Sequence, residues 1–199
     1  MPLQKQSKTL TPSQEKAVLH HVSEKRNPVR DTVIFLLSVK AGMRAKEVSS
    51  LTWQMVVDSD GEVSEFINLT NNASKGSKGG RVIPINQQLK SALVLLLGHS
   101  QSRKSFNYED AVVRTERSAS TSAQVIVNTF SRWYAELGFV GCSSHSGRRT
   151  FITNTARKIS SVGGSLRDIQ YLAGHSSLQT TQRYIEGDSE AKVKVVGLI

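Results

Sequence analysis

The stretch Leu172-Ala-Gly-His175-Ser-Ser-Leu-Gln-Thr-Thr-Gln-Arg-Tyr184 combines a helix stop, a helix start and two side chains suited to phosphate chemistry. On one unbroken helix, rotation by about 100° per residue would place His175 and Tyr184 on opposite sides. Gly174 can instead end one helix in the left-handed conformation, and Ser177 can cap the next. We therefore expect His175 at a junction between two helices and Tyr184 toward the end of the second.

An upstream block, Gly42-Met-Arg44-Ala-Lys-Glu47, carries a cation and a carboxylate at helical spacing. Glu47 follows Arg44 by three residues, so on a helix its carboxylate can hold the guanidinium in position. Gly42 can end the apolar helix that precedes it. Guanidinium suits phosphate because its planar fork can hold two oxygens and stays charged at physiological pH. Arg44 is therefore a candidate phosphate ligand.

A third block, His145-Ser-Gly-Arg148, contains a histidine and an arginine separated by three residues. If Ser144 caps a helix here, the two side chains project in nearly the same direction and can face one phosphate together. Arg149 then points elsewhere, toward backbone phosphate or solvent. The block adds a possible proton acceptor and a second candidate phosphate ligand.

These blocks, with the lysine-rich segment Asn72-Ala-Ser-Lys75-Gly-Ser-Lys78-Gly-Gly80, resemble the catalytic domain of the tyrosine recombinases, also called phage-type integrases. Members of that family cut and rejoin DNA through a phosphotyrosine. The resemblance runs from about residue 11 to residue 187. It implies an α+β fold that is mainly helical, with an integrase-type catalytic domain and a small antiparallel β-hairpin. The expected division is a leader over 1–10, the catalytic domain over 11–187, and a tail over 188–199 that is a possible exchange segment.

The resemblance also implies a role for each residue of the blocks. Tyr184 would attack the scissile phosphate, and His175 would donate a hydrogen bond to a phosphate oxygen. A phenol with a free pKa of about 10 is mostly protonated at neutral pH, so the attack needs a base or a cationic pocket that favours the phenolate. His145 is the base that we favour. The expected catalytic set is Arg44, Lys75, His145, Arg148, His175 and Tyr184, with Glu47 and Lys78 in support.

Family members supply a lysine from the hairpin to protonate the 5′-oxygen that leaves. Lys75 is the best match, but one residue more than the expected spacing separates it from Pro84, and Lys78 is near enough to act instead. Both alternatives remain open. Contacts to the DNA backbone are expected from Lys78, Arg81 and Arg149.

Composition fits a protein that binds DNA. The 199 residues carry a formal net charge of +10, and each half of the chain has an equal share of it. Basic charge spread in this way favours a polyanion as partner, because released counterions drive binding to the DNA backbone. Cys142 is the only cysteine, which excludes a disulfide framework and a cysteine zinc cluster and indicates a reducing, cytosolic setting. We find no signal peptide and no apolar run long enough to cross a bilayer.

No cofactor or metal is expected. The sequence has no Gly-x-x-x-x-Gly-Lys-Ser/Thr loop, and no group of Asp, Glu or His stands at metal-ligand spacing. Transesterification keeps one phosphodiester for each one that is broken, so the reaction can run without ATP. The expected partner is double-stranded DNA, on which family members work as tetramers at paired sites.

Local patterns predict the remaining elements. Thr11 caps a first helix with Pro12 at its first position. Further helices are expected over 31–40, from Arg44 to about Met55, over 87–97 and over 122–137, with residues 99–107 as a polar loop. In the 122–137 helix, Val125, Val127, Phe130, Trp133 and Tyr134 are expected on or near one face, in the core. Residues 65–69 and 81–85 read as two short strands, and two more helices follow Ser144 and Ser165.

One departure from the family leaves other functions open. Most family members carry a helical amino-terminal domain that closes over the opposite face of DNA, and here only about ten residues precede the catalytic domain. The layout resembles the short fimbrial-switch invertases, and a truncated integrase would look the same. The alternatives are a non-catalytic DNA-binding regulator of recombination sites and an enzyme that relaxes supercoils as type IB topoisomerases do.

Overall fold

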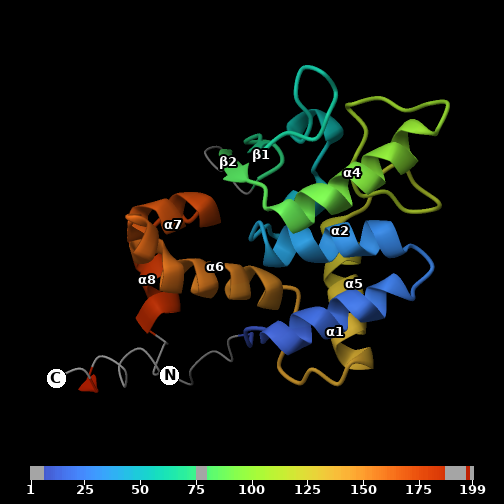
Figure 1. Ribbon diagram of the computed structural model, residues 1–199. Coiled ribbons are helices and arrows are strands. Elements are labelled where there is room, and N and C mark those ends of the chain that lie inside the picture. The colour runs from blue at the N-terminus through green and yellow to red at the C-terminus, as the bar shows by residue number, and fades with distance from the viewer. Residues whose placement is uncertain (1–6, 75–79, 187–195, 198–199) are drawn as a thin grey trace.

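The structure is a computed structural model that describes residues 7–74, 80–186 and 196–197, and it is mainly helical (Figure 1). The elements in chain order are α1 (Pro12–Ser23), α2 (Pro28–Val39), α3 (Ala45–Ser49), the 3-10 helix η1 (Trp53–Met55), β1 (Phe66–Leu69), β2 (Arg81–Pro84), α4 (Gln87–Gln101), α5 (Ala123–Glu136), α6 (Ser146–Lys158), the 3-10 helix η2 (Ile159–Val162), α7 (Leu166–Ala173) and α8 (Leu178–Glu186). The predicted fold, mainly helical with one small antiparallel sheet, is confirmed.

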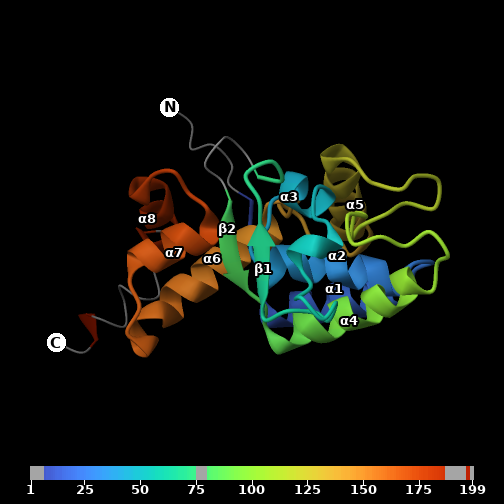
Figure 2. The same cartoon turned by 90° about the horizontal axis from the view of Figure 1, so that it is seen from above.

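The main core surrounds α2. This helix lies between α1 and α4, contacts the start of α6, and runs across α5 (Figures 1 and 2). Its apolar side chains are buried on nearly every side because neighbours cover most of its circumference. Among the described residues, the largest fully buried side chains are Trp53, Trp133, Phe35 and Phe130. The carboxy-terminal end of α2 is therefore held in place by its neighbours, and the segment from Gly42 to Glu47 follows shortly after it.

A second, smaller cluster holds the carboxy-terminal helices together. Ile152 of α6 packs with Ile169 and Ala173 of α7, and Tyr184 of α8 packs against this cluster. Figure 1 shows α6, α7 and α8 gathered on one side of the molecule, next to β2. Because α6 also packs on α2, it joins the two clusters.

The two strands form an antiparallel pair in which Ile67 faces Ile83 and Leu69 faces Arg81. Burial alternates along both strands, as expected for a sheet with one covered face. Arg81 therefore points inward together with Ile67, Leu69 and Ile83. An inward arginine requires a partner, because a buried charge without one is strongly unfavourable.

Several helix ends are fixed by the side chains and glycines next to them. Thr11 caps α1 in a capping box with Gln14, and Ser122 caps α5 by accepting a hydrogen bond from the backbone of Val125. Gly174 ends α7 in the left-handed conformation, with φ of 58°, as predicted. Gly42 likewise has a positive φ of 62°, two residues after the C-cap of α2.

Three expectations about elements were wrong. The helix expected from Arg44 to Met55 is divided into α3 and η1, because the chain extends at Thr52, which pairs with Ala111 and lets Leu51 and Trp53 enter the core. Helix α4 continues through residues 98–101, which we expected in part as loop. In α5, Val125 is 43% exposed, and Ile126 occupies the core position instead.

Residues 7–10, expected as a leader, pack against the body. The backbone nitrogen of Lys8 donates to the carbonyl of Gly141 (3.0 Å), and that of Leu10 donates to Oγ1 of Thr150 (2.7 Å). Leu10 is buried in the main core. The folded body thus begins before residue 11. The expected exchange segment, apart from residues 196–197, lies outside the described residues, as do Lys75 and Lys78.

Candidate active site

Arg44 lies at the amino-terminal end of α3 and connects this helix to the end of α7. Its backbone nitrogen and its Nη1 each lie 2.8 Å from an oxygen of the Glu47 carboxylate. Its Nη2 donates to the carbonyl of Gly174 at 3.0 Å. The expected support of Arg44 by Glu47 is thus present, and it is reinforced by a contact that local sequence did not predict.

Arg148 reaches the same place from α6. Its side chain is buried, and its two terminal nitrogens donate to the carbonyls of Gly42 and Ala173. The guanidinium therefore joins the turn that follows α2 to the carboxy-terminal end of α7. The carbonyl ends of a helix attract cations, so α7 favours both Arg148 and Arg44 at this position.

Arg81 is the inward residue of β2, and Glu47 is its partner. Nη1 of Arg81 lies 2.9 Å from Oε1 of Glu47, and Nη2 lies 3.1 Å from Oε2. Nε of Arg81 donates to the carbonyl of Leu172 at 2.9 Å. The DNA contact expected of Arg81 is not supported, because its side chain is only 2% exposed.

The carboxylate of Glu47 is the centre of this network. Its side chain is fully buried, which by itself would raise its pKa, but hydrogen bonds and charge from Arg81, followed by those from Arg44, lower the pKa to about 2. Oγ of Ser74 also donates to Oε1 of Glu47 (3.4 Å), and Nζ of Lys46 donates to the carbonyl of Ser74 (3.0 Å). The ionised carboxylate of Glu47 thus joins α3 to Ser74, which follows β1, and to Arg81 of β2.

His175 and Tyr184 lie against each other. Their ring centroids are 5.6 Å apart with an interplanar angle of 20°, a stacked arrangement. The break at Gly174 produces this approach, as the sequence predicted, because an unbroken helix would separate the two rings. The guanidinium carbon of Arg149 lies 5.7 Å from the centroid of the Tyr184 ring. Arg149 therefore contacts the candidate nucleophile, a contact that sequence reasoning missed.

Positive charge dominates the electrostatics of the site. Burial, and next the charge of Arg44, lower the pKa of Arg148 to about 9, so its guanidinium remains charged at neutral pH. Burial and the charges of Arg148, Arg44 and Arg81 lower the pKa of His175 to about 4. The imidazole of His175 is consequently neutral at pH 7.

His145 differs from the other candidates in its environment. It occupies the N-cap position of α6 in place of the expected Ser144, and it is exposed, whereas Arg148 is buried. Within the part of the chain that the structure describes, no hydrogen bond or ring contact joins its imidazole to Arg148 or Tyr184. No side chain caps α6 at His145; the turn before the helix is held by Ser146, whose Oγ accepts a hydrogen bond from the backbone nitrogen of Ser143.

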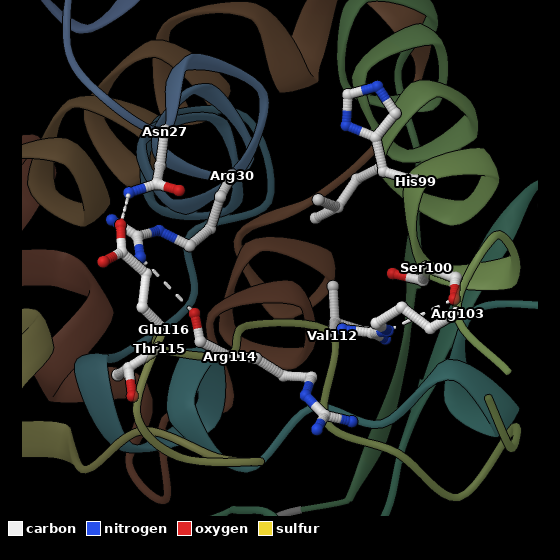
Figure 3. A pocket seen from close by; sticks show the side chains of 10 residues that line it. Asn27, Arg30, His99, Ser100, Arg103, Val112, Arg114, Thr115 and Glu116 are labelled. Carbon is white, nitrogen blue, oxygen red and sulfur yellow. Dashed lines mark hydrogen bonds between the residues drawn. The ribbon is translucent and has the colours of Figure 1, made fainter. Parts of the chain in front are cut away.

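A pocket of about 180 Å³ lies at the other end of α2 (Figure 3). Arg30, Arg103 and Arg114 line it together with Glu116, and carboxylates offset much of the positive charge, since Arg30 pairs with Asp31, and Arg114 with Asp110. This compensation distinguishes the pocket from the site at Arg44.

In the described ranges, no group of three or more His, Cys, Asp or Glu is arranged to hold a metal ion, and no helix has the length and apolar character needed to span a membrane.

Comparison with known proteins identifies the family. Residues 8–190 match the sequence model of the phage integrase family. The chain belongs to this family. Its relatives include the tyrosine recombinase XerC of Shewanella amazonensis, which is 29% identical over 96% of this chain and 62% of its own length. The XerC of Corynebacterium efficiens is 31% identical over 81% of this chain and 47% of its own length. The chain thus spans only about half to three fifths of the relatives that it matches.

Solved structures of a recombinase and of a transposon integrase have a similar fold. The crystal structure of XerA recombinase matches all of this chain and 65% of that protein, with a TM-score of 0.73 and 23% identity. The Tn1549 transposon integrase in complex with transposon right end DNA has the same TM-score at 19% identity, covering 94% of this chain and 64% of the integrase. At these identities the likeness establishes the fold.

Proposed function

We propose that this chain breaks and rejoins DNA in site-specific recombination, through a covalent bond between Tyr184 and a DNA phosphate. The observation that carries the proposal is the meeting of Arg44 and Arg148 at the carboxy-terminal end of α7, beside the stacked rings of His175 and Tyr184. The family membership supports the same reaction, since the XerC relatives are tyrosine recombinases.

The charge of the site suits phosphoryl transfer. The guanidiniums of Arg44, Arg81 and Arg148 stand against one carboxylate, that of Glu47, which leaves two positive charges uncompensated among these four groups. A phosphodiester carries one negative charge, and a second develops as the attacking oxygen approaches. Buried cations that are fixed in advance stabilise such charge without reorganisation. The site is thus matched to the transition state more closely than to the resting DNA.

The proposed reaction has two symmetrical steps. The phenolic oxygen of Tyr184 forms a bond to phosphorus, and the bond from phosphorus to the 5′-oxygen breaks, which leaves a 3′-phosphotyrosine. The phenolic proton passes to a base, for which His145 is our candidate, and the leaving 5′-oxygen takes a proton from Lys75 or Lys78. The 5′-hydroxyl of a partner strand then attacks the phosphotyrosine and releases Tyr184. Arg149 would contribute charge beside the attacking ring.

We further propose that the active form is a homo-oligomer, a tetramer on paired sites of double-stranded DNA, and that residues from Ala191 form an exchange element with a neighbouring protomer. Related structures include a lambda integrase dimer bound to a core site and XerH recombinase bound to its difH substrate. The single cysteine fits a reducing compartment, so the proposed place of action is the cytoplasm.

A nicked suicide substrate tests the proposal. On such DNA the short fragment that carries the freed 5′-hydroxyl diffuses away after cleavage. The phosphotyrosine therefore accumulates and is seen as a shifted band on a denaturing gel. The wild-type chain should form this adduct, and Tyr184→Phe should bind DNA equally well without forming it. A wild type that binds DNA and yields no adduct would support the regulator alternative. Supercoil relaxation without strand exchange would support the topoisomerase alternative.

A further inference from the structure

The buried hydroxyl of Thr181 is the hydrogen-bond partner of the His175 ring. Oγ1 of Thr181, in the first half of α8, lies 3.0 Å from Nδ1 of His175. Thr181 is fully buried. The carbonyl of His175 accepts a hydrogen bond from Nε2 of Gln170 at 3.0 Å, and the ring of Tyr184 covers one face of the imidazole. The imidazole of His175 is thus held at its backbone by Gln170, on one face by Tyr184 and at Nδ1 by Thr181.

The position of the protons follows from hydrogen-bonding capacity. A hydroxyl has one proton to donate, and a neutral imidazole has one nitrogen with a proton and one without. Thr181 has no other side-chain hydrogen bond within the described residues. If Nδ1 of His175 carried the proton, the buried hydroxyl proton of Thr181 would have no acceptor, which is unfavourable. If the hydroxyl donates to an unprotonated Nδ1, both groups are satisfied, and the imidazole proton lies on Nε2.

We propose that Thr181 is a positioning residue that fixes His175 as the neutral tautomer protonated on Nε2, and so presents that nitrogen as the hydrogen-bond donor to a phosphate oxygen. This inference rests on the proposed function for its consequence, the hydrogen bond to phosphate. The tautomer itself is a property of the free protein. In histidine sites generally, the hydrogen bond made by one ring nitrogen determines which nitrogen carries the proton.

The charge around His175 explains why tautomer control matters here. An imidazolium would carry protons on both nitrogens and would need no such control. The nearby guanidiniums of Arg44, Arg81 and Arg148, together with burial, keep the ring neutral by lowering its pKa to about 4. A neutral ring has only one proton, and on the wrong nitrogen it would present a lone pair to a phosphate oxygen.

Two matched substitutions separate the hydroxyl from the packing. Thr181→Val keeps the β-branched shape and removes the donor, whereas Thr181→Ser keeps the donor and removes a methyl group. Nitrogen-15 NMR of histidine-labelled protein without DNA, at pH 7, reports the protonation of each His175 nitrogen, with His175→Gln used to assign the signals. The wild type and Thr181→Ser should show the proton on Nε2 alone. Thr181→Val should show a mixture of the two tautomers.

Single-turnover adduct formation at saturating suicide DNA gives the second readout. Thr181→Val should react about tenfold more slowly, with an unchanged Kd for DNA, and Thr181→Ser should stay within about twofold of the wild type. A wild-type ring protonated on Nδ1, or an unchanged tautomer in Thr181→Val, would overturn the inference. If the wild type forms no adduct, the proposed function fails, while the tautomer measurement still decides the role of Thr181.

Discussion

Gly42 and Phe151 are in contact in a way that leaves no space for a side chain at position 42. A Cβ built on Gly42 would overlap the edge of the Phe151 ring, and it would lie 2.9 Å from Cε1. The backbone of Gly42 also has a positive φ, which costs other residues about 1–2 kcal/mol. The same residue supplies the carbonyl that accepts a hydrogen bond from Arg148, so a packing contact helps to place this candidate phosphate-binding side chain.

Gly42→Ala should therefore lower the free energy of unfolding by about 2–4 kcal/mol, the sum of backbone strain and overpacking against Phe151. Gly138→Ala is the matched control, because Gly138 also has a positive φ, of 68°, but open space around its Cβ position. That control should lose only about 1–2 kcal/mol. Urea unfolding measures both. Equal losses in the two variants would show that the contact with Phe151 is unimportant.

The buried pair of Arg81 and Glu47 predicts strong coupling between two substitutions. Arg81→Gln leaves a buried carboxylate with less compensation and should cost about 3–5 kcal/mol of stability. Arg81→Gln combined with Glu47→Gln should cost less than the two single substitutions together, because neither charge then remains without its partner. A double-mutant cycle by urea unfolding measures this difference. Additive losses would contradict a direct interaction.

Acid should lower the free energy of unfolding through protonation of Glu47. Its pKa is lowered from 4.5 to about 2 in the folded protein, so the unfolded chain binds a proton more readily. The stabilisation is therefore complete above about pH 4.5 and disappears as the pH falls from there toward 2, with a size of about 3 kcal/mol. Denaturant unfolding of the wild type and of Glu47→Gln between pH 6 and pH 3 tests this. Parallel pH curves for the two proteins would rule out the assigned pKa.

The cation over the Tyr184 ring predicts a specific effect on cleavage. Arg149→Gln removes the charge beside the proposed nucleophile and should slow adduct formation at saturating suicide DNA about tenfold. Arg183→Gln removes an exposed charge next to Tyr184 on the same helix, and it should leave this rate within about twofold. If both variants slow the reaction equally, general loss of DNA affinity is responsible, and Arg149 has no special place beside the ring.

Sequence reasoning succeeded where the controlling interaction was local. The cap at Thr11 and the break at Gly174 depend on residues within a few positions, so these helix boundaries and the approach of His175 to Tyr184 were predictable. Arg44 with Glu47 was predictable for the same reason. The helix expected from Arg44 to Met55 was wrong because the pairing of Thr52 with Ala111 interrupts it, and no local pattern reveals that pairing.

The partnerships of the site were harder to foresee because they join distant segments. Arg81 and Glu47 are 34 positions apart, and the sequence alone placed Arg81 on DNA. The alternation along the strand offered a signal, because Arg81 has the same parity as Ile83, which faces the core. Thr181, six positions from His175, stood within the quoted stretch, but its role depends on how the helices pack after the break.

The attachment of Ser74 and Arg81 to Glu47 has a consequence for how the chain can vary. These residues lie on either side of the segment 75–79, and both are bound to the same carboxylate, so one side chain ties the two ends of the segment to α3. A substitution of Ser74 or Arg81 consequently reaches Arg44, whose guanidinium shares that carboxylate.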